Sequence, residues 1–217
     1  MTEALYKDRF EGLYFDFDGV IVDSVPIKAH AFKKLFESYG KFVADKVYND
    51  YFNTVGINRK EKITIYHREF LNQTLSESQL NRICERFSSI VVDAIANAPL
   101  IPGIEEYLIF VHKRMPIFVI SSAPDTELKE IIRRHKLGQY FNEVLGSLTN
   151  KAVAIDMLNR KYSLDPQKCI FYGDAESDYK AAVASGVQFC AVIGRTGSSL
   201  LDKIPLVNRI KDFRELN

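Results

Sequence analysis

Four short apolar runs, each bounded by turn or cap residues, constrain the fold of this chain more than any other feature of its sequence. They are "GLYFDF", "PIFVISS", "KCIFYGD" and "VQFCAVIG", which begin at residues 12, 116, 168 and 187. Segments with helical periodicity fill most of the chain between them, and this alternation is typical of βαβ units. Because crossover helices connect parallel strands, the pattern predicts an α/β fold built on a parallel sheet.

The interval from Pro26 to about Ala98 departs from this alternation, because it has helical periodicity but no strand signal. We expect its first two helices to end at Gly40 and Gly56, since glycine is common directly after the last turn of a helix. The simplest arrangement is a block of helices inserted into the α/β part after its first strand. The expected helices span residues 26–40, 45–56, 59–73 and 76–98.

This insertion defines the expected domain organisation. A chain of 217 residues is long enough for one sizeable core with a smaller appended module. We expect a core domain formed by residues 1–24 and 99–217 and a helical domain formed by residues 25–98. The connections near residues 24–26 and 98–103 contain prolines and are the expected hinges.

The charge balance and the cysteines exclude several classes of protein. Lysine and arginine total 29 against 28 aspartates and glutamates, so no broad basic field is available to bind nucleic acid or an anionic membrane. The three cysteines lack CxxC spacing, which argues against disulfides or a zinc site. No signal-peptide pattern opens the chain, and no apolar run approaches the ~20 residues that span a bilayer. We expect a cytoplasmic protein that is a monomer or a weak homo-oligomer.

Ligands bind a parallel sheet at the carboxyl ends of its strands, so the polar residues that follow the apolar runs are the candidate site residues. Three or four acidic groups at one edge would repel each other unless a divalent cation lay among them, and their hard oxygens suit Mg²⁺. A lysine and a hydroxyl beside them would hold phosphate oxygens, which predicts a phosphoryl-transfer site. The candidates are Asp16 and Asp18, Ser121 and Ser122, Gly173, Asp174 and Asp178, and Lys151, which we expect to open the helix between the last two strands.

The motifs "DFDGVIVDS" and "GDAESD", with Ser121 and Lys151 between them, occur in the order found in the haloacid dehalogenase (HAD) superfamily. The chain resembles this family over nearly its whole length, and the helical insertion resembles that of its helical-cap branch. This branch includes phosphoglycolate-phosphatase-like and β-phosphoglucomutase-like enzymes. The resemblance implies a Rossmann-like parallel sheet core with a helical cap inserted after the first strand.

The resemblance also implies roles for the residues at the strand ends. Asp16 would be the nucleophile that forms an aspartyl phosphate, and Asp18 the acid/base that protonates the leaving oxygen and later accepts a proton from water. Ser121 and Lys151 would hold the phosphate, although the segment "TNKA" around Lys151 departs from the "KP" pattern that is commoner in this branch.

The implied metal ligands are Asp16, Asp18 through its backbone carbonyl, and Asp174, with Asp178 as a supporting group or an additional ligand. The cofactor would be Mg²⁺.

Three further residues are expected to contact the substrate. Gly19 and Ser122 neighbour the core motifs. Arg59, in the segment "VGINRKEK", corresponds to an arginine that binds the part of the substrate that is not transferred. An exposed position in the first turn of a helix is an equally open interpretation of Arg59.

The leading hypothesis is a Mg²⁺-dependent phosphatase that acts on a small phosphorylated metabolite. A phosphomutase of the β-phosphoglucomutase type is the alternative, but those enzymes carry a cap histidine where this chain has Lys28 and a lysine where it has Pro124. A dehalogenase would not need the acidic cluster. Phosphonate hydrolysis needs a cap lysine, whose nearest equivalent here is Arg59, with Lys60 and Lys62 close by. A non-catalytic binding module is the remaining class, and substitution of the nucleophile would distinguish it from an enzyme.

Overall fold

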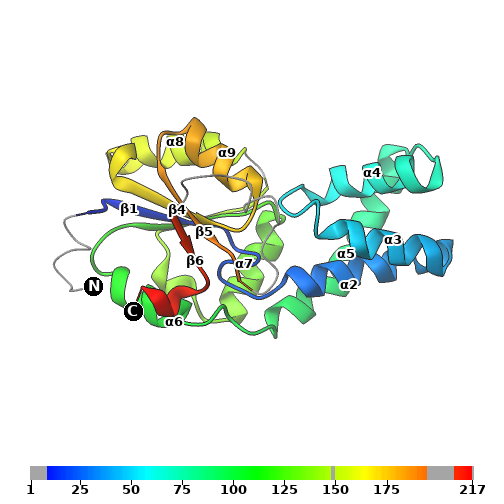
Figure 1. Ribbon diagram of the computed structural model, residues 1–217, viewed down its shortest axis with the longest axis horizontal. Helices are drawn as coiled ribbons and strands as arrows, with labels where there is room; N and C mark the ends of the chain where they lie inside the picture. The colour runs from blue at the N-terminus through cyan, green and yellow to red at the C-terminus, as the bar shows by residue number, and fades with distance from the viewer. Residues whose placement is uncertain (1–8, 148–149, 195–207, 217) are drawn as a thin grey trace.

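The computed structural model contains a six-stranded parallel sheet with helices on both faces (Figure 1). It describes residues 9–147, 150–194 and 208–216. The strand order is β3-β2-β1-β4-β5-β6, so β1 lies at the centre and pairs with β2 and β4. The α/β fold is therefore confirmed. The strands are β1 (Gly12–Phe15), β2 (Ile117–Ile120), β3 (Glu143–Leu145), β4 (Cys169–Gly173), β5 (Gln188–Val192) and β6 (Asn208–Ile210).

The four predicted strands are the buried ones, and the two that the sequence did not reveal lie at the edges of the sheet. All residues of β1, β2 and β4 are buried, as expected for parallel strands covered on both faces. The edge strands β3 and β6 have only three residues each and are largely not buried, so they give no distinct apolar run.

Helices cover the two faces of the sheet in pairs (Figure 1). Helices α8 (Lys151–Tyr162) and α9 (Glu176–Ala184) pack on one face around Phe118 and Phe171. Helices α6 (Ile104–Val111) and α7 (Asp125–Arg134) pack on the other face. Helix α8 lies between β3 and β4, so the expectation that Lys151 opens the helix between the last two strands is wrong. Lys151 precedes both of the last two predicted strands, which begin near residues 168 and 187, so its helix leads into the first of them instead of connecting the two.

The remaining helices form a separate group to one side of the sheet (Figure 1), here called the cap helices. They pack around an aromatic cluster that includes Phe32, Tyr66 and Phe87, and the described residues between Val25 and Ala98 contain no strand. The division into domains at residues 24/25 and 98/99 stays a prediction. The cap helices are α2 (Val25–Phe36), α3 (Lys41–Tyr51), α4 (Arg59–Leu71) and α5 (Glu77–Ala96).

Three boundaries of the first two cap helices differ from the expectation. Helix α2 ends at Phe36 and continues as a short 3₁₀ turn before Gly40, while α3 begins at Lys41 rather than at residue 45. Gly56 does not end α3, which stops at Tyr51. It lies instead in the loop before α4, where it serves the site described below. None of the helices in the described residues is long and apolar enough to cross a membrane.

Candidate active site

The parallel pairing of β1 with β4 brings the two acidic motifs to the same edge of the sheet. Phe15 pairs with Tyr172, and the next residue, Asp16, donates its backbone N–H to the Tyr172 carbonyl at 2.9 Å. Asp16 and Asp174 therefore follow neighbouring strands at the same level. Ser121 follows β2 on the other side of β1 and donates its backbone N–H to the Leu145 carbonyl at 2.9 Å. The topology thus places all three residues at one edge.

Three buried carboxylates form a cluster there. Asp16, Asp174 and Asp178 each offer one carboxylate oxygen, and these oxygens all lie within 4.8 Å of one another. Asp178 also accepts a hydrogen bond from the Ala175 N–H at 3.1 Å, which fixes it in the first turn of α9. Oδ1 of Asp174 is buried and has no hydrogen-bond partner among the described residues.

The electrostatics of this cluster fit a divalent cation. Burial, and then the charges of Asp16 and Asp178, raise the pKa of Asp174 well above its usual range. Burial also raises the pKa of Asp16 to about 7, although the Lys151 charge opposes this shift. Carboxylates that lie this close repel one another when all are charged, and a divalent cation among them offsets this repulsion. Mg²⁺ is bound by hard oxygen ligands of this kind. Asp16, Asp174 and Asp178 are therefore the side chains that could hold the metal.

Gly19 allows the loop after β1 to approach this cluster. Its φ is +77°, and a Cβ atom there would lie 2.3 Å from Oδ2 of Asp174. Any other residue would have to displace that carboxylate and adopt a strained backbone. The glycine of "DFDG" therefore sets the position of Asp174 as well as the turn, in addition to any contact that it makes with a substrate.

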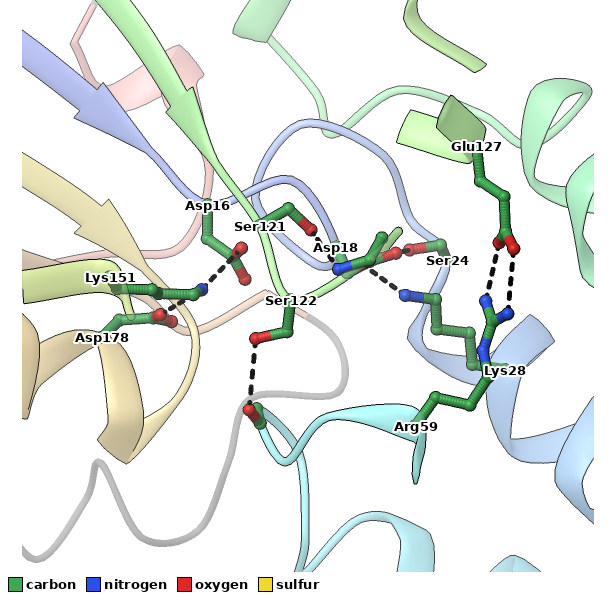
Figure 2. A network of polar contacts seen from close by, with 12 residues as sticks. Asp16, Asp18, Ser24, Lys28, Arg59, Ser121, Ser122, Glu127, Lys151 and Asp178 are labelled. Carbon is green, nitrogen blue, oxygen red and sulfur yellow. Dashed lines mark hydrogen bonds and ion pairs between the residues drawn. The ribbon is translucent and has the colours of Figure 1, made fainter. Parts of the chain in front are cut away.

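Lys151 lies between two of the carboxylates (Figure 2). Its Nζ donates to Oδ1 of Asp16 at 2.8 Å and to Oδ1 of Asp178 at 2.6 Å. Burial acts to lower the pKa of Lys151, but the two carboxylate charges outweigh it and raise the pKa above its usual value. The structure thus brings Lys151 into the acidic cluster although its surrounding segment departs from the family pattern.

Asp18 faces away from the acidic cluster and toward the cap helices (Figure 2). Its carboxylate accepts hydrogen bonds from Ser24 Oγ at 2.5 Å and from Lys28 Nζ. Burial acts to raise the pKa of Asp18, but the charge and hydrogen bond of Lys28 and the hydrogen bond of Ser24 outweigh it and lower the pKa. The two aspartates of "DFD" therefore have separate partners. The sequence identifies Lys28 only as a difference from the mutases and does not predict its contact with Asp18.

The two serines after β2 make different contacts. Ser121 is buried, and its Oγ accepts a hydrogen bond from the Ala123 N–H at 3.1 Å. Ser122 Oγ donates to the Gly56 carbonyl at 3.4 Å, which joins the core to the loop before α4 (Figure 2). Gly56 has a φ of +88°, and a Cβ atom there would lie 2.4 Å from Ser177 Oγ. A glycine at this position lets the cap loop rest directly on the core.

Arg59 links the cap to the core through a carboxylate that the sequence did not reveal. Its guanidinium donates to both oxygens of Glu127 in α7, at 2.9 and 2.7 Å (Figure 2). It also donates to Ser88 Oγ at 2.6 Å. Arg59 is the first residue of α4, but its side chain is only 11 % exposed, so the interpretation as an exposed first-turn residue is wrong. Its predicted contact with the substrate stays a prediction.

The carboxylates and the cap helices enclose a small inner cavity of about 60 Å³. A larger pocket of about 580 Å³ opens beside it, lined by Ser121, Ser122 and Lys151 from the core and by Gly56 from the cap loop. Lys62, for which the sequence predicts no role in a phosphatase, lines the inner cavity. Its spacing of three residues from Arg59 puts both on one side of α4 and could have identified it. The charged lining residues of the inner cavity are Asp16, Asp18 and Asp174 with Lys28, Arg59 and Lys62.

Comparisons with known proteins agree with this architecture. A family model described as "Haloacid dehalogenase-like hydrolase" matches residues 13–192. The phosphorylated carbohydrates phosphatase of Thermotoga maritima is 25 % identical over 185 residues, which is 82 % of each chain. Phosphoglycolate phosphatase 1 of Pseudomonas aeruginosa is 26 % identical over 203 residues, covering 88 % of this chain and 72 % of its own. The crystal structure of a predicted phosphoglycolate phosphatase from Haemophilus somnus is similar in fold, with a TM-score of 0.75 at 18 % identity, covering 100 % of this chain and 97 % of its own.

Proposed function

Because the chain belongs to the haloacid dehalogenase-like hydrolase family, we propose that it is a Mg²⁺-dependent phosphatase that hydrolyses a small phosphorylated metabolite through an aspartyl phosphate. The observation that carries the proposal is the separation of the two aspartates, with Asp16 against Lys151 and Asp18 against Lys28. Phosphatase relatives over most of the chain support the reaction class. We further propose that the enzyme acts in the cytoplasm as a monomer or a weak homo-oligomer.

The proposed reaction begins with attack of an Asp16 carboxylate oxygen on phosphorus. Lys151 and Ser121, on either side of Asp16, hold the phosphoryl oxygens as charge develops on them. A Mg²⁺ ion bound by the carboxylate cluster would offset the negative charge of the phosphate and the carboxylates.

Asp18 handles the proton in both half-reactions. It forms a pair with the Lys28 ammonium, and a proton carried by this pair passes to the leaving oxygen as the bond to phosphorus breaks. Asp18 then accepts a proton from the water that attacks the aspartyl phosphate. The contacts of the cap with Ser122 and Glu127 limit the access of bulk water to this step.

The direct test is phosphate release by the purified protein from a panel of phosphorylated metabolites with Mg²⁺. We expect release from at least one small phosphomonoester, its loss in excess chelator and its return when Mg²⁺ is restored. Full activity in excess chelator would contradict the metal assignment. Failure to release phosphate from any member of the panel would contradict the function.

Hydrolysis rather than return of the phosphoryl group to a sugar is part of the proposal. Its support is Lys28, which contacts Asp18 at the position where the mutases keep a histidine. The test is incubation with β-glucose 1-phosphate and catalytic glucose 1,6-bisphosphate, following glucose 6-phosphate and inorganic phosphate together. Efficient formation of glucose 6-phosphate with little phosphate release would favour the phosphomutase instead.

A further inference from the structure

One short segment of the cap, Gly56 and Ile57, separates the two cavities of the site. It lines the inner cavity of about 60 Å³ and also the outer pocket of about 580 Å³, as does Ser122 of the core. The inner cavity has room for only a few non-hydrogen atoms, since one water molecule needs roughly 10–15 Å³ on the same measure. Displacement of this segment would therefore join the inner cavity to the wide outer pocket.

The segment is held to the core more weakly than the helix that follows it. Ser122 Oγ donates to the Gly56 carbonyl at 3.4 Å, which is longer than the usual range of about 2.5–3.0 Å for a hydroxyl donor. Helix α4 is held instead by the hydrogen bonds of Arg59 to Glu127, at 2.9 and 2.7 Å. Hydrogen bonds between two charged groups are the stronger kind. The segment can therefore leave the core at a lower cost than α4.

A second contact of Gly56 opposes its position on the core. Gly56 lies against the first turn of α9, where a Cβ atom on it would be 2.4 Å from Ser177 Oγ. This Oγ is buried and has no hydrogen-bond partner among the described residues. A buried hydroxyl without a partner carries the cost of its lost hydration, and it regains water when the group that covers it moves away. The contact with Ser177 therefore favours displacement of Gly56.

We propose that Gly56 and Ile57 form a gate between the outer pocket and the inner cavity, and that the unpartnered Ser177 hydroxyl keeps this gate easy to open. The desolvated hydroxyl lowers the free-energy difference between the closed and the open position of the segment. Small molecules and ions then exchange with the inner cavity through the outer pocket, without displacement of α4 and its Arg59–Glu127 pair. The effect of the gate on turnover rests on the proposed phosphatase function, but the gate itself does not.

Relaxation-dispersion NMR on the Ile57 methyl group measures the gate directly, because it detects exchange between two positions on the μs–ms timescale. We expect such exchange in the unmodified protein. Ser177→Ala removes the desolvated hydroxyl and should lower the population of the open position by roughly 5- to 100-fold, the range expected for one unsatisfied buried hydroxyl. An unchanged population in this variant, or the absence of exchange at Ile57 in the unmodified protein, would overturn the gate.

Ser185→Ala is the matched control, because Ser185 lies at the other end of α9 and has a hydrogen-bond partner. Its Oγ donates to the Ala152 carbonyl at 3.0 Å. Loss of this bond should lower the thermal stability and leave the exchange of Ile57 unchanged, whereas Ser177→Ala should not lower the thermal stability. A stability loss in the Ser177 variant as large as that in the Ser185 variant would show that the Ser177 hydroxyl has a partner, and would overturn its role.

Gly56→Ala perturbs the gate in the opposite direction. The added Cβ would lie 2.4 Å from Ser177 Oγ and 2.8 Å from Ala175 Cβ, and the φ of +88° is strained for alanine. Because the segment cannot then rest on the core, the open position of Ile57 should become the more populated one. A closed position that stays dominant in this variant would contradict the assignment of the gate to Gly56.

Inorganic phosphate with Mg²⁺ tests the gate as a route. The dissociation rate of phosphate is measured by ³¹P exchange NMR and its Kd by calorimetry. Ser177→Ala should slow dissociation and association by the same factor and leave Kd unchanged, because a change in the gate that does not touch the ligand alters only the rates. Gly56→Ala should make both rates faster. A changed Kd in the Ser177 variant with an unchanged association rate would show that Ser177 contacts the phosphate, and would overturn the gate.

The outcomes distinguish the gate from the proposed function. Exchange at Ile57 and its response to Ser177→Ala need no turnover, so they decide the gate whether or not the protein is a phosphatase. Absence of phosphate binding together with a failed metabolite panel would overturn the phosphatase and leave the gate to the measurement on Ile57. Phosphate rates that stay unchanged although Ser177→Ala closes the gate would overturn the gate as the route to the inner cavity and leave the phosphatase standing.

Discussion

The active site has two walls that carry opposite charge and are built in different ways. The core wall presents carboxylates from Asp16 and Asp174, which follow paired strands, with Lys151 among them. The cap wall presents the cations of Arg59 and Lys62 from the side of a helix. Parallel strand pairing fixes where the core-wall residues lie along the sheet edge. Helix packing and a few ion pairs fix where the cap-wall residues lie. We therefore expect the reaction chemistry to depend on the core wall and the choice of substrate on the cap wall.

The largest expected effect comes from Asp16→Asn, on the core wall. An amide is a poor nucleophile, so kcat should fall by about 10⁴-fold or more. The fold should persist, because the substitution removes a buried charge whose cost is reflected in the raised pKa of Asp16. Phosphate release and thermal unfolding in the presence of chelator would measure the two effects.

The matched control is Asp23→Asn, which changes the third aspartate of "DFDGVIVDS" and is expected to leave kcat within a few-fold of the unmodified enzyme. Substantial residual turnover by the Asp16 variant would transfer the nucleophilic role to another group. It would also remove the clearest difference between the two walls.

The second expected effect concerns Lys151, which should stabilise the folded protein by offsetting the core-wall carboxylates and should also assist catalysis. Lys151→Met leaves Asp16 and Asp178 without their cation, and breaking a buried pair of this kind costs about 3–5 kcal/mol of unfolding free energy. The loss of phosphate stabilisation should also lower kcat by about 10²–10³-fold. Denaturant unfolding with and without Mg²⁺ would test this, since the metal should restore part of the lost stability.

Lys161→Met is the control for this prediction, because Lys161 lies in the same helix and pairs with Glu143 at an exposed site. Such a surface pair is worth at most about 1 kcal/mol. Equal stability losses in the two variants would mean that the carboxylate cluster does not depend on Lys151.

The same contrast explains what the sequence could predict. Asp16, Ser121 and Asp174 were identified because every polar residue after a parallel strand reaches the same sheet edge, whatever the details of packing. The partner of Arg59 could not be identified, because Glu127 lies 68 positions away on helix α7, and no short-range pattern connects them. Edge strand β3 was missed because its three residues are only half-buried.

The cap wall was under-predicted for a related reason. Helical periodicity shows which side of α4 is apolar, but it does not show whether a lysine on that side meets a carboxylate, an aromatic ring or a cavity. Lys62 looks like a surface residue in "RKEKIT", yet it is almost fully buried. Its environment follows from how α4 packs against α2 and α3, which depends on contacts distant in the sequence.

The third prediction concerns the Arg59–Glu127 pair, which links the two walls. Glu127→Gln and Arg59→Met should each weaken closure of the cap and lower kcat/KM by about tenfold, the factor that ~1.4 kcal/mol represents. Because the two residues act as a pair, the double variant should be little worse than either single variant, with a coupling energy of about 1–2 kcal/mol. Additive losses would show that Arg59 acts on the substrate independently of Glu127, as the sequence predicted.

Glu130→Gln provides the control for the link. Glu130 lies in the same helix as Glu127 and also pairs with an arginine, but its partner Arg133 is on the same helix and the pair is exposed. Its substitution should leave kcat/KM unchanged.

The smallest expected effect is the pH dependence of the stability that the Arg59–Glu127 pair contributes to the folded protein. Burial acts to raise the pKa of Glu127, but the hydrogen bonds and charge of Arg59 outweigh it, so the pKa is lower in the folded protein than in the unfolded chain. A carboxyl group with a depressed folded pKa stabilises the protein above its unfolded pKa of about 4.3 and loses that contribution as the pH falls through the folded value. The difference in unfolding free energy between the unmodified protein and Glu127→Gln should therefore be constant above about pH 5 and shrink by up to about 1 kcal/mol toward pH 3. Urea unfolding of both proteins across this range is the measurement. A difference that stays constant down to pH 3 would show that Glu127 keeps no ionic link to the cap wall, and that packing alone holds the two walls together.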